Sequence, residues 1–150
     1  MSANSVPRFT RQANISTALV NAANTNSDGT GNITTPTMYL LFTPDATNGS
    51  FLEFVRVMVT ASTAATAGNA TVIRLYLSSI NSGATTSANT HLFNEVAIPV
   101  ITADQTTTAT NYVDVPIGFA IPAAMYVLAS THMIAATSTN NNVTAFGGDY

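Results

Sequence analysis

The chain has 150 residues, which fits a single domain, and carries seven acidic residues against four basic ones, all of them Arg. Charged residues make up only 7% of the chain, Cys and Trp are absent, and 25 Thr, 23 Ala and 15 Asn dominate the composition. This composition excludes disulfides, thiolate metal sites and a Cys nucleophile, and without a basic stripe we expect no nucleic-acid partner. No apolar stretch approaches about 18 residues and the N-terminus lacks a signal-like apolar run, so we expect no membrane partner either.

The low charge also bears on assembly. Free monomers normally use Lys, Glu and Asp to stay soluble and to block sheet edges, whereas this chain has to cover its surface with Thr, Asn and Ser. Such a surface favours a protein that packs against many copies of something. The alternative is an ordinary β protein with a neutral surface.

Residues 1–12 predict an extended arm in front of the domain. Pro7 prevents a regular helix there, and two of the four Arg, Arg8 and Arg11, lie on either side of Phe9. We expect this arm to anchor to a neighbouring subunit with Phe9 buried in the contact. The alternative is a disordered tail.

The remaining residues, 13–150, read as short strands between polar turns, with no sustained helical period. In chain order the predicted strands are 15–21, 38–42, 51–60, 71–78, 91–102, 111–115 continuing into 117–121, 125–133 and 143–146. Pro99 inside one of them argues for an edge or a bulge, and the Asn run at 140–142 predicts a turn. About eight such strands predict an all-β, single-domain antiparallel β-sandwich, and a jelly roll is the best single choice at this length.

The clearest strand is 51–60, whose two faces alternate along the sequence. One face carries Phe51, Glu53, Val55, Val57 and Val59, and the other carries Leu52, Phe54, Arg56, Met58 and Thr60. Both faces are mostly apolar, so we expect both to be covered.

The C-terminal residues place two large side chains, Phe146 and Tyr150, on either side of a glycine pair. We expect Phe146 to lie in the sandwich core and Tyr150 to pack at the domain end or at a subunit interface. Gly147 and Gly148 would then allow a tight reversal of the backbone.

Candidate catalytic groups are sparse. A Ser-His-Asp set could combine His132 and Asp114 with a Ser, but no Gly-x-Ser-x-Gly motif accompanies it, and His91 and His132 both fall at predicted strand ends. Glu53 and Glu95 could form an acid/base pair, but each is better explained as an ion-pair partner of an Arg on the strands. The sequence therefore predicts that the protein is not an enzyme.

Candidate binding loops are equally weak in chemical terms. Residues 26–32 alternate oxygen-bearing side chains as calcium loops do, but they lack a second carboxylate and a closing Glu, which favours a simple turn. We expect no metal and no cofactor. Three polar, nearly uncharged loops, 61–69, 79–90 and 103–110, suit hydrogen bonding to neighbouring subunits or to sugars, or are plain solvated turns.

Several segments, in this order, resemble a family of small proteins from tailed bacteriophages. They are the runs that begin Ile15-Ser-Thr-Ala, Asn24-Thr-Asn-Ser-Asp-Gly-Thr-Gly, Ile73-Arg-Leu-Tyr-Leu, Phe93-Asn-Glu-Val-Ala-Ile-Pro, Ile121-Pro-Ala-Ala-Met-Tyr and Ala145-Phe-Gly-Gly-Asp-Tyr. The resemblance extends over residues 13–150. It implies a jelly-roll or β-sandwich protein of the virion, located at the capsid surface.

The resemblance implies a non-enzymatic structural protein that decorates or cements the capsid by binding across neighbouring subunits of the major capsid protein. Decoration at three-fold positions would make it a homotrimer. The expected capsid or subunit contacts are Pro7, Arg8, Phe9, Arg11 and Tyr150. The alternative function is a glycan- or receptor-binding module of a head fibre, tail fibre or collar.

Overall fold

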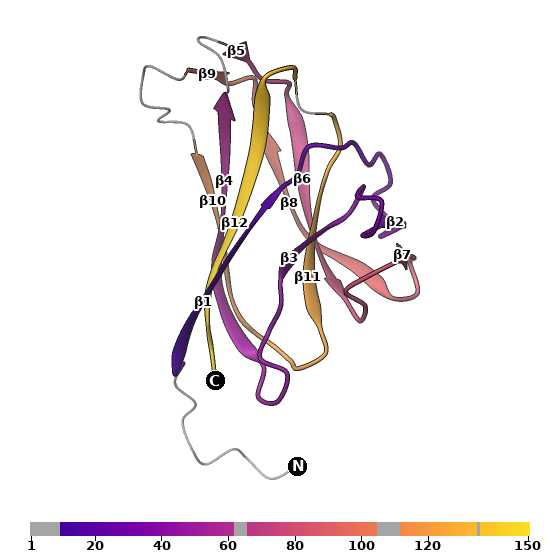
Figure 1. The fold of residues 1–150 in the computed structure, drawn as a ribbon, viewed down its shortest axis with the longest axis vertical. Helices are drawn as coiled ribbons and strands as arrows, with labels where there is room; N and C mark the ends of the chain where they lie inside the picture. Colours follow the sequence, from indigo (N-terminus) through magenta and orange to yellow (C-terminus); the bar gives the residue numbers. More distant parts are fainter. Residues whose placement is uncertain (1–9, 62–65, 105–111, 135) are drawn as a thin grey trace.

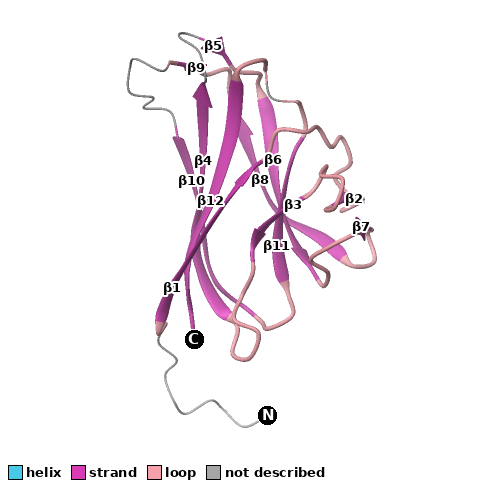
Figure 2. Cartoon of the chain, in the orientation of Figure 1, coloured by secondary structure: helices cyan, strands magenta, loops and turns pink. Residues whose placement is uncertain are grey.

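The computed structural model of the chain describes residues 10–61, 66–104, 112–134 and 136–150, and within these ranges it contains strands and no helix (Figures 1 and 2). No described helix is therefore available to cross a membrane. The long strands are β1 (Gln12–Leu19), β3 (Tyr39–Phe42), β4 (Ser50–Ala61), β6 (Thr71–Ser78), β8 (Thr90–Ile98), β10 (Tyr112–Ile121), β11 (Tyr126–Thr131) and β12 (Thr139–Asp149). Two short ribbons pair β2 (Gly31–Asn32) with β7 (Ala84–Thr85) and β5 (Thr66–Ala67) with β9 (Thr102–Ala103).

The eight long strands form two antiparallel four-stranded sheets. Sheet A has the order β1-β12-β4-β10, and sheet B has the order β3-β11-β6-β8. Neighbours in each sheet come from distant parts of the chain, and the first and last long strands lie side by side (Figure 1). This interleaving of two Greek keys is the jelly roll, so the predicted all-β jelly-roll sandwich of about eight strands is confirmed.

The hydrophobic core fills the space between the two sheets. Because successive side chains of a strand point to opposite faces, Val55, Val57 and Val59 of β4 face inward together. Sheet B contributes Ile73 and Leu75 from β6 to the same core. The other fully enclosed apolar side chains of this core include Val20, Leu41, Phe42, Leu52, Ile98, Ile121, Val127 and Val143.

A bulge in β4 corrects the predicted phase of this strand. Phe54 pairs with Phe146, but the next pair joins Leu52 to Gly147, so Glu53 is an extra residue on this strand. One extra residue exchanges the two faces, and Leu52 is consequently buried in the core instead of lying beside Phe54. The predicted alternation holds from Phe54 onward and fails before it.

Two expectations for the C-terminal region are wrong. The Asn run at 140–142 is not a turn, because it lies inside β12, where the buried Asn141 amide donates to the Val20 carbonyl oxygen at 3.3 Å. The chain also does not reverse at Gly147 and Gly148, since β12 runs on to Asp149 between β1 and β4. A Cβ at position 147 would collide with the carbonyl oxygen of Phe51, so this glycine permits close approach of two strands.

The boundary of the N-terminal arm also shifts. Gln12 already belongs to β1, and the Arg11 amide donates to the carbonyl oxygen of Asp149 at 2.7 Å. Residues 1–9 lie outside the described residues. Pro99 is predicted to mark a sheet edge or a bulge. It follows Ile98, the last residue of β8, and β8 is an edge strand of sheet B.

Candidate interaction surface

The side of sheet B that points away from the core is covered by the chain itself. The connection from β1 to β3, residues 20–38, passes over this sheet, and Met38 packs there against Tyr76 and Leu128 in a second buried cluster. Ile33 and Leu40 pack against the rim of the cluster. This face is therefore closed to partners over the area of the cluster.

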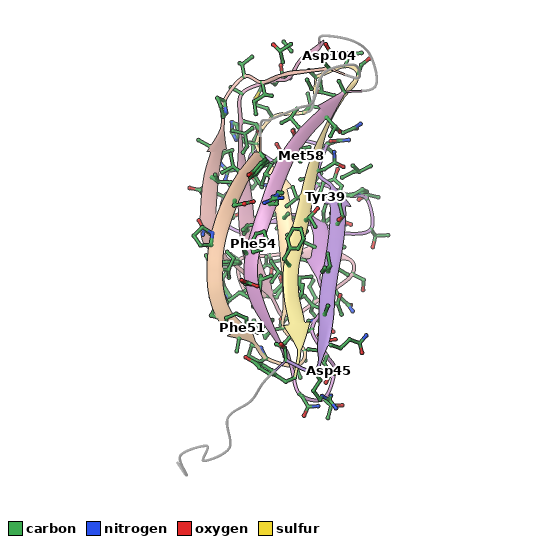
Figure 3. The ribbon with its side chains drawn as sticks, turned by 90° about the vertical axis from the view of Figure 1, so that its left-hand side faces the viewer. Tyr39, Asp45, Phe51, Phe54, Met58 and Asp104 are labelled. Atoms are coloured by element: carbon green, nitrogen blue, oxygen red, sulfur yellow. The ribbon has the colours of Figure 1, made fainter. Side chains whose placement is uncertain are left out.

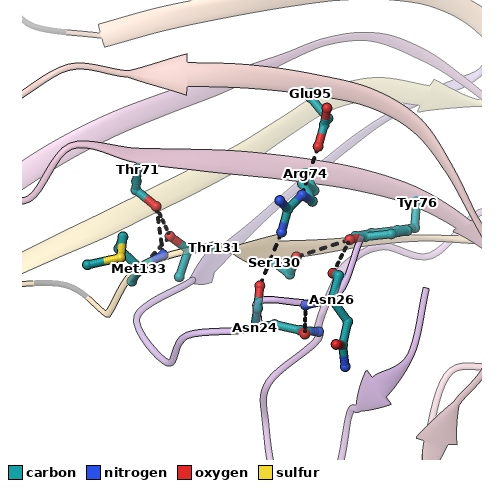
Figure 4. Close-up of polar contacts among 9 residues, drawn as sticks. All are labelled: Asn24, Asn26, Thr71, Arg74, Tyr76, Glu95, Ser130, Thr131 and Met133. Atoms are coloured by element: carbon teal, nitrogen blue, oxygen red, sulfur yellow. Dashed lines mark hydrogen bonds and ion pairs between the residues drawn. The ribbon is translucent and has the colours of Figure 1, made fainter. Parts of the chain in front are cut away.

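Polar contacts fasten the same connection to sheet B (Figure 4). The buried guanidinium of Arg74 donates to Glu95 Oε1 at 2.8 Å and to the carbonyl oxygen of Asn24 at 3.2 Å. The Tyr76 hydroxyl donates to the carbonyl oxygen of Asn26 at 3.2 Å, and burial raises the pKa of this phenol. Arg74 and Glu95 thus form one of the two predicted Glu–Arg pairs, and its role is structural. The other prediction is wrong, because the second strand arginine, Arg56, pairs with Asp114 and not with Glu53.

The outer face of sheet A is different, because three rows of side chains cross its four strands without any described segment above them (Figure 3). We call these twelve residues the outer face. From β1 to β10 the rows are Ile15, Phe146, Phe54 and Pro116; then Thr17, Thr144, Arg56 and Asp114; then Leu19, Asn142, Met58 and Tyr112. The expectation that both faces of residues 51–60 would be covered is not met within the described chain.

Aromatic and aliphatic side chains dominate the first and third rows. Phe54 and Phe146 stack with ring centroids 4.5 Å apart and planes 12° apart. Both rings are half-buried on the side of sheet A away from the core, so the expectation that Phe146 lies in the core is wrong. Ile15 is 59% exposed, Leu19 53% and Tyr112 49%. An apolar patch of this kind, open on a sheet face, is characteristic of a contact surface.

The two charges of the outer face neutralise each other. Arg56 donates from Nε and Nη2 to the two carboxylate oxygens of Asp114, at 2.7 and 2.8 Å. The guanidinium carbon also lies 4.2 Å from the centre of the Tyr112 ring. These hydrogen bonds from Arg56 hold the pKa of Asp114 below its ordinary value, and they leave the outer face without net charge.

Of the predicted contact residues, the structure brings Arg11 and Tyr150 together. Arg11 Nη2 donates to the carbonyl oxygen of Tyr150 at 2.6 Å, and the Tyr150 amide donates to the carbonyl oxygen of Gly49 at 3.2 Å. A hollow of about 260 Å³ lies beside this end of sheet A and is lined in part by Arg11 and Phe51. The other three predicted contacts, Pro7, Arg8 and Phe9, lie outside the described residues.

The catalytic alternatives are not assembled by the fold. Asp114 is engaged by Arg56 on sheet A, whereas His132 follows β11 on sheet B. Glu53 is exposed at the bulge of β4, on the opposite sheet from Glu95. Neither the triad nor the carboxylate pair therefore forms a common site.

A second hollow, of about 400 Å³, is lined by apolar residues that include Ile98 and Pro99 together with His132. The Nδ1 atom of His132 is buried without a hydrogen-bond partner in the described chain. The lining also includes Thr71, whose hydroxyl is hydrogen-bonded to Thr131 and to the Met133 amide. One imidazole beside this hydroxyl does not provide the paired acid and base that hydrolytic chemistry requires.

The loop weighed as a calcium site folds as a turn. Asp28 accepts hydrogen bonds from the amide and the hydroxyl of Thr30, at 3.0 and 3.1 Å, and these bonds lower the pKa of its carboxyl group. Among the described residues no three His, Cys, Asp or Glu side chains gather in a way that could hold a metal ion.

Sequence reasoning missed the outer face, although part of its signal was present. Ile15 and Leu19 are apolar residues of the predicted strand 15–21, but only the pairing of β1 with β12 shows that both point away from the core. Comparison of the chain with protein-family models, with curated proteins and with solved structures gave no match.

Proposed function

We propose that this protein is a non-enzymatic structural component of a tailed-phage virion, which decorates or cements the capsid by binding across neighbouring capsid subunits. The observation that carries the proposal is the outer face of sheet A, in which two largely apolar rows flank a polar one and which the described chain leaves open, as expected of a protein that assembles with others. Several sequence segments resemble, in the same order, a family of small tailed-phage proteins, and this resemblance indicates the class of partner. The jelly roll supplies a rigid scaffold for such a surface.

The proposed partner is the major capsid protein, and the proposed location is the capsid surface. A homotrimer matches the three-fold positions that decoration proteins occupy. Repetition over many sites stabilises a shell even when each contact is weak, because a ligand that binds only the assembled state favours it by about 2.7 kcal/mol at a hundredfold excess over Kd.

The arm end of the molecule is the proposed capsid contact. Arg11 and Tyr150 lie side by side there, and Pro7, Arg8 and Phe9 belong to the segment that leads away from Arg11 in the sequence. A cationic and aromatic segment joined to a rigid sheet can reach a neighbouring subunit without disturbing the sandwich.

Binding to particles tests this proposal. We would compare the full chain with a variant that lacks residues 2–9, which keeps Arg11 and all of β1, on purified capsids that lack the protein. The expected result is saturable binding by the full chain and at least tenfold weaker binding by the truncated one. Equal binding of the two would exclude the arm as the anchor.

Copy number distinguishes the capsid from the alternative location. Quantitative mass spectrometry of purified virions should give hundreds of copies for a decoration protein. About a dozen copies or fewer would instead support the glycan- or receptor-binding module of a fibre or collar.

A further inference from the structure

We infer that the outer face of sheet A is covered by a second copy of this chain. The inference rests on the homo-oligomer of the proposed function, and it does not depend on the capsid. It assigns the contact between copies to the three rows that run from Ile15, Thr17 and Leu19 on β1 to the edge strand β10.

The two sheets of the sandwich differ in whether a described segment of the chain covers their outer side. Sheet B has its own cover, in which Met38 packs on Tyr76 and Leu128 and the Asn24 carbonyl accepts from the buried Arg74. Sheet A has aromatic and aliphatic side chains on its outer side and no described segment above them. Exposing such a surface to water is unfavourable, at about 25 cal/mol for each Å² of apolar area, so an external cover stabilises the molecule.

The charge of the outer face selects a partner that is itself nearly uncharged. Its single cation, Arg56, and its single anion, Asp114, are paired with each other through two hydrogen bonds. A strongly acidic or basic partner would find no counter-charge here, and it would lose hydration without compensation. This chain meets the requirement, because only 7% of its residues are charged.

The hydrogen-bonding groups of the outer face also fit a self-contact. Thr17 and Thr144 share a hydrogen bond at 3.0 Å, and the Asn142 amide donates to the Thr60 hydroxyl at 2.7 Å. These polar groups are therefore partly satisfied within the sheet before any partner arrives. Covering them costs less desolvation than covering free amides and hydroxyls would.

The size of the outer face sets how much further surface a stable contact needs. Four strands spaced about 4.8 Å apart and three rows spaced about 6.8 Å apart span roughly 400 Å² before the relief of the side chains is added. Specific protein contacts bury about 800 Å² on each partner. The outer face would therefore form the centre of the contact, and adjoining surface of sheet A would supply the rest.

Sedimentation velocity on the purified full chain, from 1 to 100 µM, tests the inference. The test variant carries Ile15→Lys and Leu19→Lys, two positions that are more than half exposed and so accept Lys without changing the core. The matched control is Val100→Lys, since Val100 is 62% exposed in the loop after β8 and lies off sheet A. Circular dichroism establishes that each variant is folded.

We expect the unaltered chain and the control to form the same oligomer, and the double variant to dissociate with a Kd at least tenfold higher. A chain that is monomeric at 100 µM would overturn the inference. An oligomer that the double variant leaves intact, or that the control disrupts equally, would also overturn it.

Hydroxyl-radical footprinting of the unaltered chain gives an answer even where the double variant fails to fold. Met58 lies on the outer face, and Met133, which is 43% exposed after β11, is the internal reference. Association should reduce oxidation of Met58 by at least fivefold and leave Met133 unchanged. Equal oxidation of Met58 at low and high protein concentration would overturn the inference.

A second copy must also be distinguished from the chain's own N-terminal segment as the cover of the outer face. If residues 2–9 covered the outer face, their removal would raise Met58 oxidation at every concentration with no change in mass, and that result would overturn the inference. Unchanged association of the truncated chain supports it. Failure of the full chain to bind capsids, with association between copies intact, would count against the proposed function alone, so the two failures are distinguishable.

Discussion

Arg56 forms the ion pair on sheet A whose effect on the pKa of its partner can be measured. Its guanidinium donates two hydrogen bonds to Asp114 and lies over the ring of Tyr112, so one side chain links strands β4 and β10 on the outer face. The pair is partly exposed, with about a third of each side chain open to solvent, and its contribution to stability is correspondingly small. The ion pair should therefore change the pKa of Asp114 more measurably than it changes the free energy of unfolding.

We expect the carboxyl group of Asp114 to titrate below its ordinary pKa of 3.8, because Arg56 donates hydrogen bonds to the ionised form and adds a favourable charge. A depressed folded-state pKa means that the stabilisation is present above about pH 4 and is lost as the pH falls through the lowered value. Carboxyl NMR of the chain and of Arg56→Gln measures this directly. In the variant the midpoint of Asp114 should rise toward 3.8, while that of Asp28, held by Thr30, should not move.

Gly147 is the position at which an added methyl group should do most harm. Its Cβ would collide with the Phe51 carbonyl oxygen and lie 3.2 Å from the Phe42 ring. We expect Gly147→Ala to lower the free energy of unfolding by about 3 kcal/mol in urea denaturation. Gly83→Ala is the comparison, since it meets no atom within 4 Å and only its φ of 79° is unfavourable, at about 1 kcal/mol. Equal losses in the two variants would contradict the steric explanation.

At the scale of elements, β12 is the strand that organises sheet A. It pairs with β1 on one side and with β4 on the other along almost its whole length. The bulge at Glu53 separates two zones of β4, and it turns Leu52 into the core while Phe54 stays outside. The pair of β12 and β4 therefore contributes to the core on one side and to the outer face on the other.

The assignment of faces predicts unequal costs for two truncations. Leu52→Ala removes a fully buried side chain and should cost about 3–5 kcal/mol. Phe146→Ala removes a half-buried ring that stacks on Phe54, and it should cost about 1–2 kcal/mol. Urea denaturation at one fixed protein concentration compares them. A larger loss for Phe146→Ala would place that ring in the core after all.

At the scale of the whole molecule, the two ends of the described chain are tied together. Arg11 bonds the carbonyl oxygens of Asp149 and Tyr150, and the Asp149 carboxylate accepts from Asn14 and from Ser50. These bonds join the first and last long strands, which are neighbours in sheet A although they lie far apart in the sequence.

Deletion of residues 147–150 should therefore destabilise the entire domain. It removes three pairs of β12 with both neighbours and the partners of Arg11, so we expect the melting temperature to fall by roughly 10 °C. Calorimetry should show no such change on deletion of residues 2–9, which precede every described strand. An unchanged melting temperature after the C-terminal deletion would mean that this end is dispensable.

Local patterns in the sequence predict the fold class and most strand positions. Alternating Val, Ile, Leu and Thr with polar breaks is a local signal, since a strand buried on one side repeats every two residues, and it predicts the segments at 71–78 and 125–133. The continuous apolar run at 38–42 predicts a strand in the same local way. For these strands the neighbouring residues carry all of the information. Opposite charges on predicted strands also predict that Glu95 pairs with an Arg, but the register of β6 and β8 decides that the partner is Arg74.

Which surface is open depends on how distant strands pair. Ile15, Leu19 and Phe146 are as apolar as core residues, and they became an outer face because β1 pairs with β12 and a bulge at Glu53 fixes the phase of β4. Asn141 has the local preference of a turn but is held in a strand by bonds to residues about 120 positions away. Such outcomes depend on register between distant segments, and a shift of one residue would exchange inside and outside.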